Sequence, residues 1–390
     1  MKKFFTLLFM VSLILVSCDK SEEETLCQLT VQLTSDTEEI PLAGFDIKVK
    51  DLKSGTLMEP QKSTEKGIAV FNVAKGQYDI TAEFFEGEDC LYYGSQENLT
   101  VSSSTTATIK VLPLKKPSTK TFVLDELYFN GNNNGGYDNT YYEQYFTIRN
   151  VSDRALYADG LSFGITGDFN SMEELNKMHD LLPDVVVLSQ MYTLPGDGTT
   201  YKVEPGESLV IAFSAVNHKE GGEKPNSLDL SGADFEIYIQ GAMTADNPEV
   251  PNVIVNFSTF QAFQWQYSGA SPILLFRLDE DAASFIEKNK EVFPNPASMG
   301  MMDQDFIKLP SKYIIDAVET SVADNLYHKV LPTEIDKSSI AIPGTGMLGD
   351  GFYGHFVQRK AAAEGYVLDT NDSANDFELI TGGAKNYPKK

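Results

Sequence analysis

The chain has 390 residues and a formal net charge of −25, so it is longer than one usual domain and strongly acidic. An acidic surface repels nucleic acid and offers no basic patch for phosphate, which excludes nucleic acid as a partner. The same acidity is a common way to keep an exposed protein soluble, so it identifies no specific partner. No cysteine–histidine cluster has zinc-site spacing, and we expect no bound metal and no cofactor.

Residues 1–24 have the layout of a bacterial secretory signal. Lys2 and Lys3 precede an apolar run of about a dozen residues, which is shorter than the ~20 that a membrane-spanning helix needs. A small residue, Ser17, stands directly before Cys18, and an acidic stretch follows.

This segment resembles the lipobox of bacterial lipoproteins, which implies a signal peptide over residues 1–17 and a lipid-anchored N-terminus at Cys18. Residues 18–24 resemble the leader that exports Bacteroidota lipoproteins to the outer face of the outer membrane. Two alternatives stay open: an ordinary cleaved signal, and a linker whose charge simply keeps it solvated.

Residues 25–114 contain short runs in which apolar and polar side chains alternate, separated by turn residues. The runs at 29–33 and 45–49 are the clearest, and a third run places Ile68 and Val70 on one face. This pattern predicts a small antiparallel β-sandwich.

Three glycine-containing segments of this domain carry a family resemblance. They are Pro-Leu-Ala-Gly-Phe at 41–45, Gly-Ile-Ala-Val-Phe at 67–71 and Gly-Gln-Tyr-Asp-Ile at 76–80. Together they resemble transthyretin-like carboxypeptidase-regulatory and Cna-B-type domains. The resemblance implies a stalk or adaptor without catalytic activity.

The two cysteines that remain besides Cys18 both lie in this first domain. An even pair in an oxidising compartment can form a disulfide, so we expect a bond between Cys27 and Cys90. The alternative is two buried free thiols that pack as small apolar side chains.

A linker and a second domain follow. Residues 115–120 have the lysine, proline and serine composition of an interdomain linker, and strand patterns begin again at 121 and extend to 390. Ser171 with Glu174 forms a capping box that predicts a helix to about Leu182, and a second helix is expected over 281–292. The predicted fold class is mainly β, with two antiparallel β-sandwich domains in tandem, the second larger and carrying a few helical insertions.

The domain over 121–390 carries two further resemblances. Segments 124–128, 142–150, 204–211 and 369–377 resemble the strands, the Pro-Gly-Glu turn and the closing segment of lamin-tail domains. Segments 156–160, 216–218, 227–230 and 313–319 resemble a Bacteroidota lipoprotein family known as a domain of unknown function. Members of that family lie at the cell surface beside a TonB-dependent outer-membrane transporter. The resemblance implies a partnership in uptake and no reaction.

The chain has four histidines, at 179, 218, 328 and 355. No two stand four residues apart, so they can share a metal only if the fold brings them together, and we expect isolated polar or capping roles. His218 is the best candidate for ligand binding, because it directly follows an apolar strand pattern and so lies at a loop mouth.

Aromatic side chains supply the other candidate ligand-binding residues, Tyr137, Tyr141 and Trp265. Flat rings of this kind can stack on a sugar or an aromatic siderophore, and the alternative is ordinary core packing. The acidic segment 369–376 offers oxygens to Ca²⁺, but it lacks the glycine and terminal Glu of an EF-hand, so we expect a hydrogen-bonded turn there.

These observations favour a non-enzymatic, surface-exposed outer-membrane lipoprotein, anchored through its N-terminal lipid, that binds a ligand or docks on a TonB-dependent transporter. The alternative is an extracellular hydrolase that acts on glycans with paired carboxylates. Acidic residues are too numerous for the sequence to single out a pair, so no catalytic residue is named.

Overall fold

The computed structural model describes residues 26–37, 39–86, 89–114, 121–132, 143–173, 175, 177–220, 226–241, 246–260, 265, 269–343, 354–361 and 367–389. The expected signal peptide and leader, the linker at 115–120, Tyr137 and Tyr141 lie outside these residues. Within the described ranges, no helix is both long and apolar enough to cross a membrane.

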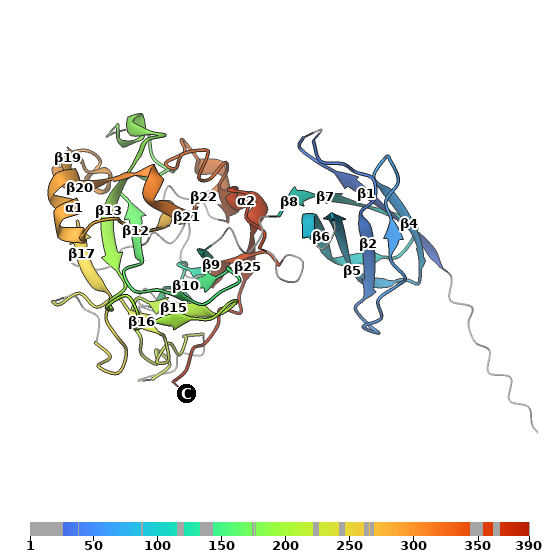
Figure 1. The fold of residues 1–390 in the computed structure, drawn as a ribbon, viewed down its shortest axis with the longest axis horizontal. Coiled ribbons are helices and arrows are strands. Elements are labelled where there is room, and N and C mark those ends of the chain that lie inside the picture. The colour runs from blue at the N-terminus through green and yellow to red at the C-terminus, as the bar shows by residue number, and fades with distance from the viewer. Residues whose placement is uncertain are drawn as a thin grey trace, which may run out of the picture. The chain divides into compact units, whose positions relative to one another are not determined.

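The chain divides into two compact units (Figure 1). The first unit comprises Met1–Ala82 and Ser95–Lys110, and the second comprises Glu83–Gly94 and Val111–Lys390. The tip of one hairpin, which the sequence places in the first domain, therefore groups with the second unit.

Two sheets form the first unit. The strands in this region are β1 (Cys27–Thr34), β2 (Asp46–Asp51), β3 (Gln61–Lys62), β4 (Ile68–Val73), β5 (Gly76–Glu86), β6 (Asp89–Val101) and β7 (Thr105–Lys110). One sheet has the order β4-β1-β7, and the other runs β3-β2-β5-β6 and continues to β8 (Leu112–Pro113). β1 is antiparallel to β4 and parallel to β7, and the pairs β2–β3 and β6–β8 of the other sheet are antiparallel. Leu29 and Val31 of one sheet and Ile47 and Ile80 of the other are fully buried.

The buried face of β4 differs from the expectation. Val70 is 40% exposed, whereas Phe71 and Val73 are buried. In the antiparallel register, Phe71 lies opposite Leu29, whose side chain is in the core, and directly opposed residues point to the same face of a sheet. The alternation expected through Ile68 and Val70 was wrong by one residue, because small Ala69 occupies a core position.

Cys27 begins β1 and is a buried free thiol in the structure, which contradicts the expected disulfide. Its side chain lies on the face that packs into the core, where a thiol behaves as a small apolar group. The backbone of Cys90 belongs to β6, and its side chain lies outside the described part of the structure.

Most of the second unit is a pair of larger sheets. Its further strands are β9 (Phe122–Tyr128), β10 (Tyr145–Asn150), β11 (Leu156–Tyr157), β12 (Ser162–Thr166), β13 (Val185–Thr193), β14 (Lys202–Val203), β15 (Ser208–Ala212), β16 (Phe235–Glu236), β17 (Ile254–Ser258), β18 (Ile273–Phe276), β19 (Lys290–Pro294), β20 (Asp303–Pro310), β21 (Ile314–Val318), β22 (Thr320–Val322), β23 (Ile340–Ile342), β24 (His355–Arg359) and β25 (Phe377–Thr381).

One of these sheets has the order β16-β15-β10-β9-β24-β25, and the other has the order β19-β20-β13-β12-β18-β21, with β17 paired to β13. Short pairs β11-β14 and β22-β23 accompany them. A single apolar core joins the two sheets, with Phe146 from β10 packed edge-on against Phe163 from β12 at 4.9 Å between ring centroids. The mainly β fold class and the sandwich-like tandem arrangement are confirmed.

Of the two expected helices, one is present in the described residues, and it is shorter than expected. The segment from Ser171 contains only the 3₁₀ turn η3 (Met178–Leu181) among its described residues, because Lys177 before it adopts a left-handed conformation with φ 59°. The second expected helix is present as α1 (Ala282–Asn289), which Asp281 caps by accepting a hydrogen bond from the Ser284 amide. Its chain then continues into β19. The remaining helical elements are the 3₁₀ turns η4 (Pro296–Ser298), η5 (Ser311–Tyr313) and η6 (Ala323–Asn325) and the short α-helix α2 (Ser373–Asp376).

Candidate functional site

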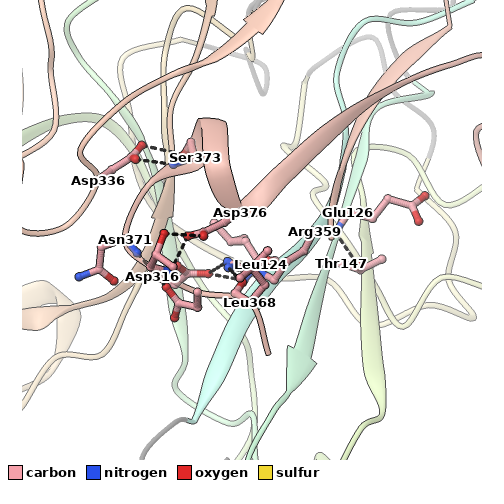
Figure 2. Close-up of polar contacts among 12 residues, drawn as sticks. Leu124, Glu126, Thr147, Asp316, Asp336, Arg359, Leu368, Asn371, Ser373 and Asp376 are labelled. Atoms are coloured by element: carbon pink, nitrogen blue, oxygen red, sulfur yellow. Dashed lines mark hydrogen bonds and ion pairs between the residues drawn. The ribbon is translucent and has the colours of Figure 1, made fainter. Parts of the chain in front are cut away.

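A buried charged network lies between β9, β21 and β24 (Figure 2). The Arg359 guanidinium donates to Asp316 at 2.6 Å and to the carbonyls of Leu124 at 2.9 Å and Leu368 at 3.0 Å. Asp316 also accepts from the Leu124 amide at 2.7 Å. Both ionic side chains are less than a tenth exposed, and each is bonded to backbone from another segment. Such satisfied charges hold segments together, so we assign this network a structural role.

The acidic segment at 369–376 is a hydrogen-bonded turn, as expected. Asp376 accepts from the Thr370 amide at 2.8 Å and from the Thr370 hydroxyl at 2.7 Å. Asp336 accepts from the Ser373 amide and hydroxyl, each at 2.7 Å, and fixes the start of α2. Burial raises the pKa of Asp336 to about 6 and also raises the pKa of Asp376. These carboxylates are engaged by the protein itself.

An open polar hollow lies beside the segment that follows β15. An antiparallel bridge joins Asn217 and Asp229, with the His218 amide donating to the Leu228 carbonyl and the Leu230 amide donating to the Val216 carbonyl, each at 3.0 Å. The hollow has a volume of about 500 Å³ and is lined by Val216, Asn217, Glu220, Asp229, Ser231, Asp246, Asn247, Pro248, Pro388 and Lys389. The segments 216–218 and 227–230, which resemble the family of unknown function, thus supply part of its wall.

The last described residues complete the wall of the hollow. The amide of Tyr387 donates to the Asp229 carbonyl at 2.7 Å, and the Tyr387 carbonyl accepts from the Gly232 amide at the same distance. The Lys389 amide donates to the Ser231 hydroxyl at 3.1 Å. The marked C-terminus in Figure 1 lies near β15 and β16 for this reason.

Glu236 lies beneath the hollow at the end of β16. Its side chain is buried and accepts from the Asn247 amide at 2.6 Å and from the Ala215 amide at 3.1 Å. Burial, together with the neighbouring Asp246 carboxylate, raises the pKa of Glu236 to about 7. A carboxyl with such a shifted pKa next to a concave surface marks a candidate functional site. Because Glu236 accepts hydrogen bonds from the Ala215 and Asn247 amides, its charge state affects the two segments that line the hollow.

Of the expected ligand-binding residues, the structure describes His218 and Trp265, and neither lines the hollow. His218 is partly buried, and its Nε2 lies 3.0 Å from the Ser214 carbonyl, while its neighbours Val216 and Asn217 face the hollow. Trp265 is only 2% exposed and packs 5.2 Å from Phe129, ring centroid to ring centroid. The core-packing alternative is therefore confirmed for Trp265, and the stacking role is wrong.

The fold brings two of the other histidines together, which sequence spacing did not predict. His179 and His328 have ring centroids 5.3 Å apart, and His328 Nε2 lies 3.0 Å from an Asp168 carboxylate oxygen. His355 lies in β24, and burial lowers its pKa. No sequence pattern predicts that Asp168 and His328 meet, because they are 160 residues apart in the chain.

Comparison with known proteins finds one matching family model. Residues 204–382 match the model described as Protein of unknown function (DUF4876). A solved DUF4876 family protein from Bacteroides thetaiotaomicron is 21% identical with a TM-score of 0.55, and the match covers 90% of this chain and 94% of that one. No curated protein matches this chain.

Two further solved structures are similar only weakly. A DUF3823 family protein from Parabacteroides merdae is 9% identical over 47% of this chain and 100% of its own, with a TM-score of 0.18. A streptococcal ancillary pilin is 12% identical over 60% of this chain and 62% of its own, also with a TM-score of 0.18. At that level of similarity neither carries an argument, whereas the Bacteroides structure supports the fold.

Proposed function

Because residues 204–382 match a family model whose function is unknown, we propose a role from the site itself. The chain is a non-enzymatic, surface-exposed lipoprotein of the outer membrane, anchored through Cys18. Its second unit binds a ligand or docks on a TonB-dependent transporter. The observation that carries this proposal is the polar hollow beside β15 and β16.

The hollow is preorganised for binding. Its walls are fixed by main-chain hydrogen bonds between segments 216–218 and 227–230 and by the Asn247 side-chain amide, which donates to the Ala215 carbonyl at 2.6 Å. A surface that is already ordered loses little conformational freedom when a ligand binds. Several convergent polar groups in one concavity are the usual composition of a ligand site.

The chemistry of the lining favours a ligand that donates hydrogen bonds or carries positive charge. Glu220, Asp229 and Asp246 contribute carboxylates, and Lys389 pairs with Glu249 at the rim. The net charge of −25 attracts cationic groups to the same face over a distance of roughly 8–10 Å at physiological salt. A polyhydroxylated ligand and a basic loop of a transporter share this recognition chemistry.

The hydrolase alternative has one observation in its favour, the Glu236–Asp246 pair. Glu236 is the buried member with the raised pKa, and Asp246 lines the hollow. The Glu236 carboxylate accepts hydrogen bonds from the Ala215 and Asn247 amides, so it is engaged by the chain itself, whereas the acid and base of a glycosidase face a substrate from carboxyls roughly 5–10 Å apart. We therefore assign Glu236 to holding the wall of the hollow.

Affinity capture from intact cells followed by mass spectrometry tests the proposal. We expect the full chain to recover an outer-membrane transporter, or a retained glycan or iron chelate. The double variant Glu220→Gln with Asp246→Asn should reduce that recovery at least tenfold, and Glu287→Gln on exposed α1 should leave it unchanged. Recovery of neither a transporter nor a ligand would refute the binding role.

Cell-surface location needs its own assay. Protease treatment of intact cells should remove the protein if it faces outward. Protection from protease in intact cells, with digestion after lysis, would refute surface display. Glycan hydrolysis that is lost in Asp246→Asn would support the enzyme instead.

A further inference from the structure

Three side chains from separate segments meet beside β12 and β13. Asp168 lies directly after β12, His179 belongs to η3, and His328 follows β22 and η6. One ligand atom from each of the three lies within 4.8 Å of the other two. The site is separate from the hollow, so the inference drawn from it goes beyond the proposed function.

The Asp168 carboxylate is held in place from both sides. One of its oxygens accepts from the Phe169 amide at 2.9 Å, and the other lies 3.0 Å from His328 Nε2. The Thr166 hydroxyl donates to the Asp168 carbonyl at 3.0 Å, which fixes the turn that carries the carboxylate. The carboxylate therefore presents one oxygen toward the histidines.

The segment that carries His328 is anchored to the same turn. The amides of Tyr327 and His328 both donate to the Asn170 carbonyl, at 2.9 and 3.3 Å. Lys329 pairs with buried Glu319 at 2.8 Å, and the Asn170 side chain donates to the other oxygen of Glu319 at 3.0 Å. The adjacent lysine charge is thereby neutralised within the protein, which removes an obstacle to a cation at His328.

The third ligand, His179, stands at the more exposed side of the cluster. Its side chain is 17% exposed, against 9% for His328 and 6% for Asp168. An Asp180 carboxylate oxygen lies 3.2 Å from His179 Nε2. A carboxylate at one ring nitrogen orients the ring of a metal-binding histidine. A cavity of about 10 Å³, roughly the space of one water molecule, has Asp168 and His179 in its lining together with valine and methionine side chains.

Two imidazoles and one carboxylate are a donor set that first-row transition metals accept, and three protein ligands leave coordination positions open. Ligand atoms bound to one ion, each about 2.0–2.2 Å away from it, lie roughly 3–4 Å apart. Donors that already lie within 4.8 Å of one another need only small side-chain adjustments to reach that spacing. We infer that Asp168, His179 and His328 bind one divalent transition-metal ion.

Zinc binding by the purified full chain, free of any histidine tag and treated with chelator, tests this inference. Isothermal titration with Zn²⁺ is expected to show one site per chain with a micromolar or lower dissociation constant. Asp168→Asn, which keeps the shape of the side chain, His179→Gln and His328→Gln should each weaken binding at least tenfold. His218→Gln removes a histidine of the same unit outside the cluster and should bind like the wild type.

Co²⁺ absorption gives an independent measurement, because a nitrogen and oxygen site of low coordination number produces visible bands that an aqueous ion lacks. Ca²⁺ should not compete, since it prefers all-oxygen sites. Circular dichroism without metal checks folding, and His179→Gln is the variant least expected to disturb the fold because its side chain is the most exposed of the three. Absence of stoichiometric Zn²⁺ binding, or binding that all three variants retain, would overturn the inference.

Discussion

The two units bury different kinds of side chain. Among the described residues of the first unit, Ser63 is the polar side chain in the core, and it bonds only to the backbone of Phe45 and Leu42. The second unit buries charged groups, including Arg359 and Glu319, that bond to segments far away in the chain. The core of the first unit therefore consists almost entirely of apolar side chains, whereas the second unit also buries charges that must find particular partners.

The largest effect that separates the units is expected from Arg359→Leu. This change leaves Asp316 buried without its cation, which costs about 3–5 kcal/mol of unfolding free energy. Urea unfolding followed by fluorescence isolates the second unit, because Trp265 is the chain's single tryptophan and lies in that unit's core. Adding Asp316→Leu to the variant should recover part of the loss; an unchanged midpoint in Arg359→Leu would show that the network adds no stability.

Two valine substitutions in β4, one at a buried and one at an exposed position, test how the core of the first unit is packed. Val73→Ala removes buried methyl groups and should cost about 2 kcal/mol, whereas Val70→Ala, at a 40% exposed position, should stay within about 0.5 kcal/mol. Far-UV circular dichroism during denaturation measures both variants. Equal losses would mean that the register of β4 against β1 is wrong.

The two units should also differ in their response to pH. The pKa of Glu236 is raised from its ordinary 4.5 to about 7, so its contribution to stability is fully present below about pH 4.5 and is lost as pH rises through about 7. Asp336, with a pKa of about 6, acts in the same direction. In the first unit, hydrogen bonds from the Ser54 and Lys53 amides lower the pKa of Asp51, whose contribution is lost only as pH falls below its ordinary 3.8.

Glu236→Gln tests this pH dependence directly. The variant should raise the melting temperature of the second unit at pH 8 by a few degrees, since about 1 kcal/mol corresponds to roughly 2–4 °C in a unit of this size. At pH 5 it should change little. Trp265 fluorescence during heating measures the melting temperature. If the melting temperature of the variant falls between pH 5 and pH 8 by as much as that of the wild type, the assignment of the pH dependence to Glu236 is contradicted.

The smallest effect is expected from Lys62→Met. Its ion pair with Asp46, at 2.8 Å, lies at the surface of the first unit with the lysine side chain 65% exposed. Exposed pairs contribute about 0–1 kcal/mol, so far-UV circular dichroism should show an almost unchanged midpoint. A loss comparable to that of Arg359→Leu would remove the contrast between surface and buried charges.

Strand positions were predictable where alternation is regular, and contacts between distant segments were not. The pattern at Leu29, Val31 and Leu33 predicted β1 correctly, because each apolar side chain faces one core. The pattern failed at Ala69, which is small but buried, and at Ser171, where a capping box leads into a left-handed Lys177 instead of a helix. Local signals cannot report what the rest of the fold does to a segment.

Among the candidate sites, too, the sequence pointed to a single segment and missed contacts between distant segments. The segment at 216–218 was singled out correctly as a loop mouth, although the hollow is lined by Asn217 and not by His218. The Asp168 cluster was missed, because its members come from three segments and none has a motif of its own. Trp265 was misassigned because an aromatic residue in a β protein looks the same in sequence whether it is buried or exposed.

The anchoring of Tyr387 and Lys389 to Asp229, Gly232 and Ser231 has a consequence for how this protein is synthesised and handled. A ribosome makes these residues after every other part of the hollow, so the cavity is completed only when translation of this stretch has ended. A truncation that removes Tyr387 to Lys389 would take away this part of the hollow's wall and leave the strands of the two sheets in place.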